Sequence, residues 1–177
     1  IVVSFARLKA AQVDEASRLA TVQPGLVNQE LQRRLAPSGL IFPPDPASYS
    51  VSTIGGNVAE NAGGPHCLKY GVTGSYVHGL EVVLADGSCV WFGGACYDPP
   101  EYNFTSLLTG SEGALGLITR VVLGLRRPAA GVKTLTASFA KVADAGQAVS
   151  AVIAAGLTPA TIELMDHNMI NLVEDYL

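Results

Sequence analysis

The chain has 177 residues, of which 49% are hydrophobic and 15% charged, enough for one complete core and part of another domain. The net charge of −4 and the lack of any Lys/Arg-rich run argue against a nucleic-acid partner, because phosphate binding needs a basic surface. The three cysteines form no C-x-x-C pair, which favours a reducing cytoplasmic setting, and no apolar run is long enough to span a bilayer.

Short apolar segments and turn residues alternate in the first part of the chain. Leucine and valine recur every four residues after Pro24-Gly25, which predicts an amphipathic helix over residues 26–36. Three prolines make residues 42–47 a stiff, extended lead-in to the segment that follows. The other elements expected here are strands over residues 1–5 and 18–23 and a short helix over residues 57–62 that starts at Gly55-Gly56.

The later part of the chain changes character at Pro128. Before it, Asp86-Gly87 between two apolar runs predicts a hairpin of strands 76–84 and 88–92, and a turn-rich segment follows over residues 93–102. A helix is expected over residues 104–109 and a strand over residues 117–125. After it, the pattern predicts strands over 134–139 and 158–165 and helices over 142–155 and 168–176, with a domain boundary near residues 128–133.

Residues 52–71 carry five glycines among small and amide side chains, which makes poor core material. One interpretation is that bare main-chain N–H groups face a ligand, with a helix start at Gly55-Gly56 that directs free amides and a positive dipole end at an anion. The other interpretation is a long loop whose glycines only serve turns. Composition alone does not separate the two.

The order of residues favours the first interpretation. STIGGNVAENAGG at residues 52–64, KYG at 69–71, GLEVVLADG at 79–87 and GSEGALGLIT at 110–119 together resemble the FAD-binding domain of the vanillyl-alcohol-oxidase (PCMH-type) flavoproteins. Within that group the chain is most similar to the family of the glycolate oxidase FAD subunit and the D-lactate and D-2-hydroxyglutarate dehydrogenases. The resemblance covers nearly the whole chain in the family's own order.

The resemblance implies an α+β fold in two parts. Residues 1–130 would form the second half of a PCMH-type FAD-binding domain, with a mixed or antiparallel sheet and flanking helices. Residues 131–177 would begin a ferredoxin-like substrate domain. Because the chain starts without Met and stops inside a helical pattern, we expect a fragment that lacks the N-terminal lobe of the FAD domain and most of the substrate domain. No catalytic residue and no metal ligand is expected within it.

The cofactor contacts implied by the resemblance lie in three segments of the chain. They are Pro24, Gly25, Thr53, Gly55, Gly56, Asn57, Ala59, Asn61, Gly63, Gly64, Glu112, Gly113, Gly116 and Ile118. His66, Cys67 and Lys69 follow the glycines, and one interpretation of the resemblance is that they reach the flavin ring edge or the substrate channel. Nothing in the sequence singles out His66 or Cys67 for a covalent flavin link or a zinc site, so we interpret both as ordinary loop residues.

The resemblance further implies FAD as cofactor and a small 2-hydroxy acid as substrate, with hydride transfer to flavin N5. The alternatives are a D-lactate dehydrogenase of the same family, or a non-catalytic domain that keeps the fold and binds a nucleotide or a partner. A glycolate oxidase-like protein would have a second FAD-type subunit and an iron–sulfur subunit as partners. Its location would be cytoplasmic, peripheral to the inner membrane through these subunits.

Overall fold

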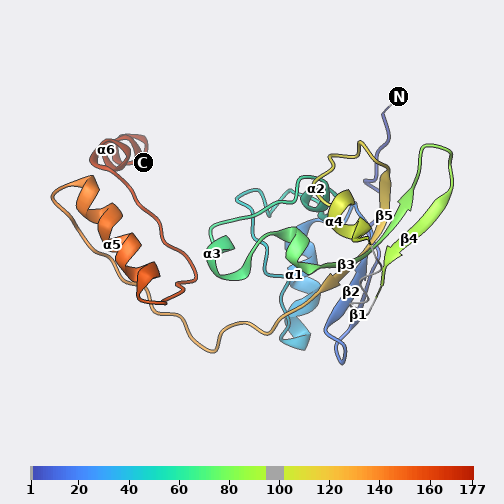
Figure 1. Ribbon diagram of the computed structural model, residues 1–177, viewed down its shortest axis with the longest axis horizontal. Helices are drawn as coiled ribbons and strands as arrows, with labels where there is room; N and C mark the ends of the chain where they lie inside the picture. The colour runs from blue at the N-terminus through green and yellow to red at the C-terminus, as the bar shows by residue number, and fades with distance from the viewer. Residues whose placement is uncertain (1, 95–101) are drawn as a thin grey trace.

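A five-stranded antiparallel sheet dominates the computed structural model, which describes residues 2–94 and 102–177 (Figure 1). The spatial order of its strands is β1-β2-β5-β3-β4, and each of the four pairings is antiparallel. The strands are β1 (Ala11–Asp14), β2 (Leu19–Val22), β3 (Val77–Val83), β4 (Cys89–Gly93) and β5 (Leu117–Gly124). The expected α+β class with an antiparallel sheet is therefore confirmed.

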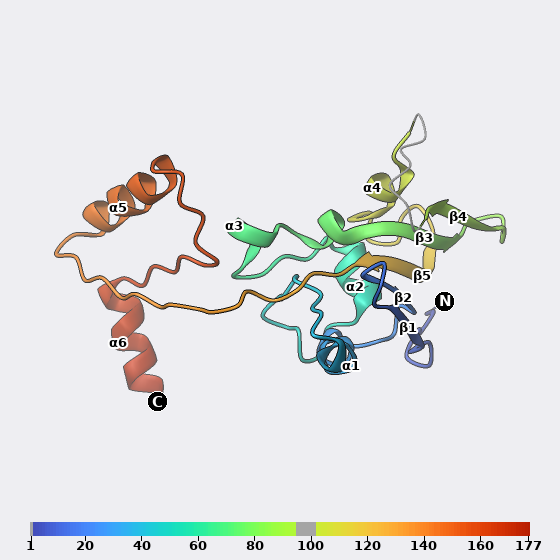
Figure 2. The same cartoon turned by 90° about the horizontal axis from the view of Figure 1, so that it is seen from below.

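Helices cover both faces of the sheet. Figure 2 shows α1 (Asn28–Leu35) and α2 (Ile54–Ala59) on one side and α4 (Phe104–Leu108) on the other. The four-residue spacing of Leu31 and Leu35 directs both side chains into the core, where neither is exposed to solvent. Each such burial contributes about 1.5–3 kcal/mol. The helix continues into a 3-10 turn (Ala36–Ser38) that ends at Gly39, whose left-handed φ of 64° stops it.

The hairpin between β3 and β4 turns at Asp86-Gly87, as the sequence predicts. Gly87 has a φ of 84°, which a residue with a side chain rarely adopts. The Asp86 carboxylate accepts hydrogen bonds from the backbone N–H of Ser88 (2.9 Å) and from its hydroxyl (2.6 Å). The turn therefore follows from local side-chain chemistry. The turn-rich segment predicted over residues 93–102 lies mostly outside the described residues.

Three expected strands are wrong. Residues 2–5, 134–139 and 158–165 join no sheet in the described parts of the chain. A strand needs ladder hydrogen bonds to a neighbour, and the two edges of the sheet are formed by β1 and β4 instead. The sequence pattern also missed β1 and the short helix α3 (Cys67–Tyr70). Apolar periodicity identifies segments that can pair but not whether a partner is present.

Two helices form the C-terminal part, α5 (Val142–Ala154) and α6 (His167–Tyr176), close to the expected ranges. Both lie apart from the sheet, beyond an extended linker (Figures 1 and 2). The Asp166 carboxylate caps α6 by accepting a hydrogen bond from the N–H of Met169 (2.8 Å), as the sequence suggests. Apolar side chains such as Leu172 remain exposed, so these helices bury little surface against the described residues.

A strained residue in the β1–β2 turn offers a test of this fold. Arg18 adopts a left-handed φ of 53°, and its carbonyl accepts a hydrogen bond from the N–H of Leu125. We expect Arg18→Gly to raise the free energy of unfolding by about 1 kcal/mol in urea denaturation, because glycine adopts this backbone without strain. The control Arg33→Gly, on the exposed face of α1, should lower it by about 1 kcal/mol. A loss of stability in Arg18→Gly would contradict the turn geometry.

The half-buried imidazole of His78 predicts how stability depends on pH. Burial lowers the pKa of His78, on β3, below its usual value of about 6.5. The folded protein then keeps the imidazole neutral at a pH where the unfolded chain binds a proton. Stability should be full above about pH 6.5 and fall as the pH drops below it. Unfolding free energies between about pH 8 and pH 5 should show a weaker acid loss in His78→Gln; an unchanged loss would exclude this imidazole as its source.

Candidate functional site

The glycine-rich segment begins with α2, which runs over Ile54–Ala59 rather than the predicted residues 57–62, so Gly55 and Gly56 lie inside its first turn. Thr53 is its N-cap, and the Thr53 hydroxyl oxygen accepts a hydrogen bond from the Gly56 N–H (3.2 Å). The N–H of Ile54 donates to the Leu26 carbonyl (2.7 Å) and that of Gly55 to the Pro24 carbonyl (2.8 Å). The free amides expected at this helix start are therefore paired within the protein, because the turn before α1 lies directly against it.

Two of the predicted contact residues, Pro24 and Gly25, form that turn. A Cβ added to Gly25 would lie 2.0 Å from the Phe5 carbonyl oxygen, and one added to Gly55 would lie 2.5 Å from Cβ of Pro24. Both glycines therefore permit a close approach between segments of the protein itself. This packing brings Pro24, Gly25, Thr53 and Gly55 together.

The second glycine pair is packed in the same way. A Cβ on Gly63 would lie 2.5 Å from the Cys67 sulfur, and one on Gly64 would lie 2.2 Å from the Asp45 carbonyl oxygen. The Gly64 N–H donates to the Cys67 sulfur at 2.8 Å. Three of the four glycines in these two pairs thus face protein atoms. The interpretation that the bare main chain of these glycines faces a ligand therefore does not apply to these three.

Gly56 and Gly113 are the open positions. Both are exposed; a Cβ on Gly56 would meet only the Thr53 hydroxyl oxygen, at 3.4 Å, and one on Gly113 would meet no atom within 4 Å. Beside Gly56, Asn57 is 2% exposed, and its amide nitrogen has no hydrogen-bond partner among the described residues. A buried donor without a partner is costly and usually marks a ligand or a functional role. Open main chain beside an unsatisfied amide fits a nucleotide cofactor.

The second predicted motif lies against the end of α2. The N–H of Gly110 donates to the Val58 carbonyl (2.9 Å) and that of Glu112 to the Ala59 carbonyl (3.0 Å). Glu112 adopts a left-handed φ of 52° and is exposed beside Gly113. These bonds connect two motifs that are about 50 residues apart in the sequence. They place the segment that contains Gly113 against the C-terminal end of the helix that contains Gly56.

The remaining predicted residues lie deeper or further along the chain. Ile118 is 9% exposed within β5, and its side chain belongs to the core. Gly116 packs against β3, where an added Cβ would lie 2.5 Å from a Val82 methyl group. The Asn61 side-chain oxygen accepts a hydrogen bond from the Gly74 N–H (2.8 Å), which ties the end of α2 to the next 3-10 turn. All three positions therefore contact other parts of the protein.

One pair of polar residues escaped the sequence analysis. The Asp45 carboxylate contacts Nδ1 of His66, which precedes α3. The two residues are 21 positions apart and no local pattern connects them; the only signal was that Asp45 lies between two prolines, before the glycines. Tertiary packing of Gly64 on Asp45 brings them together.

Other features of the described residues do not compete with this site. A hollow of about 370 Å³ lies along α1, lined by Lys9, Glu30 and Arg33 and, at the turn before the helix, by Leu26. Within residues 2–94 and 102–177, there is no group of three or more His, Cys, Asp or Glu side chains that could hold a metal ion. Within the same residues, every helix is too short or too polar to cross a bilayer.

Comparison with known proteins identifies related families and structures. The FAD binding domain family matches residues 1–93, and the C-terminal domain of FAD linked oxidases matches residues 129–177. The glycolate oxidase subunit GlcD of Bacillus subtilis is 45% identical over 93% of this chain and 35% of its own length. A D-lactate dehydrogenase of Archaeoglobus fulgidus is 34% identical over 98% of this chain and 39% of its own.

A solved structure of alkyldihydroxyacetonephosphate synthase shares the fold, with a TM-score of 0.60 and 28% identity over 69% of this chain and 22% of its own. The chain spans about a third of the length of the curated relatives that it matches. The match to residues 1–93 covers more than half of the sequence and includes the Pro24-Gly25 turn and α2. The chain therefore belongs to the FAD-binding domain family, and its cofactor is FAD.

Proposed function

We propose that this sequence is part of an FAD-dependent enzyme that oxidises a small 2-hydroxy acid, of the glycolate oxidase type. The observation that carries the proposal is the arrangement around α2. Open main chain at Gly56 lies beside the unsatisfied amide of Asn57, in a helix that packs on the Pro24-Gly25 turn at its start and on the segment containing the open Gly113 at its end. The relative named glycolate oxidase subunit GlcD supports the substrate class.

The residues divide into two roles in this proposal. Gly56 and Gly113 allow the cofactor to lie close to the main chain, and Asn57 offers its amide to a polar group of the cofactor. The remaining positions keep these three in place, namely Pro24, Gly25, Thr53, Gly55, Ala59, Asn61, Gly63, Gly64, Glu112, Gly116 and Ile118. When bound, FAD supplies the hydride acceptor at N5 and takes the electron pair from the substrate.

We further propose that residues 1–130 act as FAD-binding domain and residues 131–177 as the start of a substrate domain. The separate family matches and the distance between the sheet and the C-terminal helices in Figure 1 support this division. Because relatives are about three times as long, we expect the 177 residues alone to bind FAD weakly and to turn over no substrate.

Purification of the complete gene product that contains this sequence tests the function. We expect a stoichiometric flavin in its visible absorption spectrum and reduction of that flavin by glycolate. Turnover with an artificial electron acceptor should be faster with glycolate than with D-lactate. Faster turnover of D-lactate would favour the D-lactate dehydrogenase alternative, which the Archaeoglobus fulgidus relative supports. A flavin-free protein that still folds would favour the non-catalytic alternative.

The partners follow from the same proposal. The relatives of Bacillus subtilis and Escherichia coli are named as subunits, which supports an assembly with further chains. We propose a second FAD-type subunit and an iron–sulfur subunit, in the cytoplasm and peripheral to the inner membrane through these partners. Co-purification with a tag on this chain, followed by measurement of bound iron and flavin, tests that composition.

A further inference from the structure

The Asp45–His66 pair lies at the end of the glycine-rich segment and has no role in binding as described so far. Nδ1 of His66 contacts the Asp45 carboxylate, and both side chains are partly accessible, at 42% and 34% exposed. A carboxylate that accepts the Nδ1–H of a histidine holds the ring in one orientation and leaves Nε2 as the atom that exchanges a proton. This is the arrangement of a general acid–base pair.

The carboxylate of this pair is held rigidly. Asp45 lies between Pro44 and Pro46, which are both buried and restrict the backbone. The Pro44 carbonyl accepts a hydrogen bond from the Asn28 side chain (3.0 Å), which anchors the segment to α1. Gly64 packs directly on the Asp45 carbonyl from the other side. Such support on several sides is typical of a group held for a function rather than of a mobile surface loop.

The imidazole retains one nitrogen for another partner. In the described parts of the chain, Nε2 of His66 has no hydrogen-bond partner. The charged and titratable groups near the ring are Asp45 from the proline-rich lead-in and, on α3 itself, Cys67, Lys69 and Tyr70, whose ring centroid lies 6.3 Å from the imidazole. The Lys69 ammonium lies over the Tyr70 ring at 5.6 Å, so it is directed at that ring.

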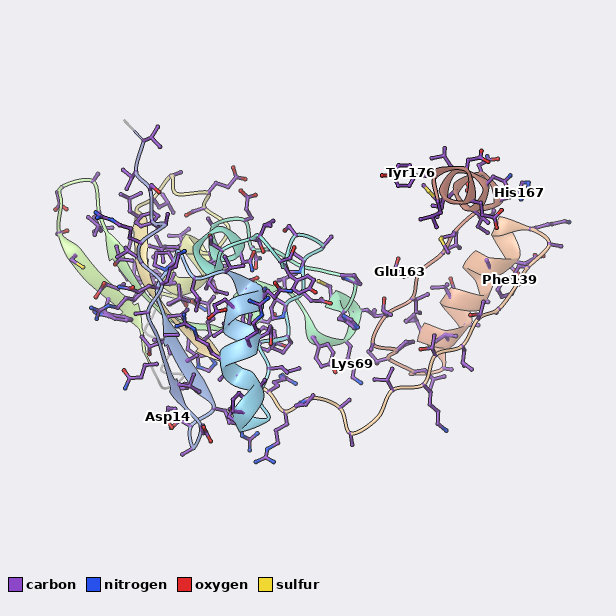
Figure 3. All side chains as sticks on the ribbon, turned by 180° about the vertical axis from the view of Figure 1, so that it is seen from behind. Asp14, Lys69, Phe139, Glu163, His167 and Tyr176 are labelled. Atoms are coloured by element: carbon purple, nitrogen blue, oxygen red, sulfur yellow. The ribbon has the colours of Figure 1, made fainter. Side chains whose placement is uncertain are left out.

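The position of α3 relates the pair to the proposed reaction. His66 follows Gly64 by two residues and therefore lies beside predicted cofactor positions. In Figures 1 and 2, α3 is on the end of the sheet domain that faces the C-terminal segment, and Figure 3 shows Lys69 on the same end. In the proposed function, this is the side from which the substrate domain approaches the cofactor.

We propose that Asp45 and His66 form a proton-holding pair for the oxidation, an inference that rests on the proposed function. In the reaction, the C2–H bond breaks and its hydride leaves with both electrons to the cofactor, while the hydroxyl group loses a proton as the C=O bond forms. As the site gains these electrons, Nε2 of His66 binds one proton. That proton is the one released by the hydroxyl group, and it reaches His66 through solvent. The imidazolium then offsets the added negative charge, and the Asp45 carboxylate stabilises the imidazolium.

Redox titration of the bound flavin as a function of pH tests this proposal, using the complete gene product. The pH dependence of the midpoint potential counts the protons taken up per electron pair. Between about pH 6 and pH 8, we expect two protons in the native protein and one in His66→Gln, whose side chain cannot take up a proton. Asp45→Asn removes the carboxylate that stabilises the imidazolium, so fewer than two protons should be taken up over the same range. The control His167→Gln, on the exposed surface of α6, should behave as the native protein.

Each outcome decides the question. One proton in both the native protein and His66→Gln, or two in both, would overturn the proposal, and so would an equal loss in His167→Gln. If His66→Gln does not fold, the proton count in Asp45→Asn decides alone, and a count equal to that of the native protein rejects the pair. A native protein that holds no flavin would instead refute the proposed function. The two failures are therefore distinguishable.

Discussion

Replacing Gly64 with alanine is expected to lower the free energy of unfolding by about 3 kcal/mol. The added Cβ would lie 2.2 Å from the carbonyl oxygen of Asp45 and 2.6 Å from its carboxylate. Neither can move away readily, because prolines on both sides restrict the Asp45 backbone and the Asn28 side chain anchors it. Urea denaturation monitored by circular dichroism would measure the loss.

The matched control for Gly64 is Gly56, which belongs to the same segment but faces open space. Gly56→Ala should leave stability unchanged or raise it by up to about 1 kcal/mol, because alanine is the better helix former. If Gly64→Ala proves as stable as Gly56→Ala, the contact between Gly64 and Asp45 is wrong. The Asp45–His66 pair would then lose its structural support.

Replacing Gly56 with valine is expected to lower FAD affinity by about 100-fold in the complete gene product while leaving the fold intact. Two methyl groups on the exposed face of α2 would occupy the space proposed for the cofactor, and a steric cost of about 3 kcal/mol corresponds to that loss. The fold is spared because the Gly56 N–H still bonds to Thr53. Titration of apoprotein with FAD, followed by flavin fluorescence, would measure the affinity.

Gly146→Val is the control for this substitution. Gly146 also lies in a helix, α5, with no atom within 4 Å of an added Cβ, but far from the predicted cofactor positions. Its FAD affinity should equal that of the native protein. Native affinity in Gly56→Val would show that the cofactor does not lie over this face of α2, even if the protein is a flavoprotein.

Several elements were predictable because their causes are local. The spacing of Leu31 and Leu35 determines the buried face of α1, Asp86-Gly87 determines the β3–β4 turn, and the carboxylate of Asp166 caps α6. Propensity, turn chemistry and capping act over a few residues, so they can be recognised without knowledge of the fold. The family resemblance rests on the same kind of local information, the ordered motifs around residues 52–64 and 110–119.

Strand pairing was not predictable in this way. Residues 134–139 and 158–165 have strand-like composition yet pair with no strand in the described residues, while the polar segment β1 does pair. Ladder hydrogen bonds depend on which segment is adjacent in space, and that is a property of the whole fold. Composition therefore predicted strands in apolar runs that do not pair, and it gave no signal for β1.

The sequence by itself determined the family, the cofactor class and the positions of the glycines, because these depend on residue identity and order. Only the tertiary structure decided what each glycine faces: protein for Gly25, Gly55, Gly63 and Gly64, and open space for Gly56 and Gly113. It also brought Asp45 to His66 across 21 residues. The reason is physical, since a missing side chain permits close approach but does not specify which atoms approach.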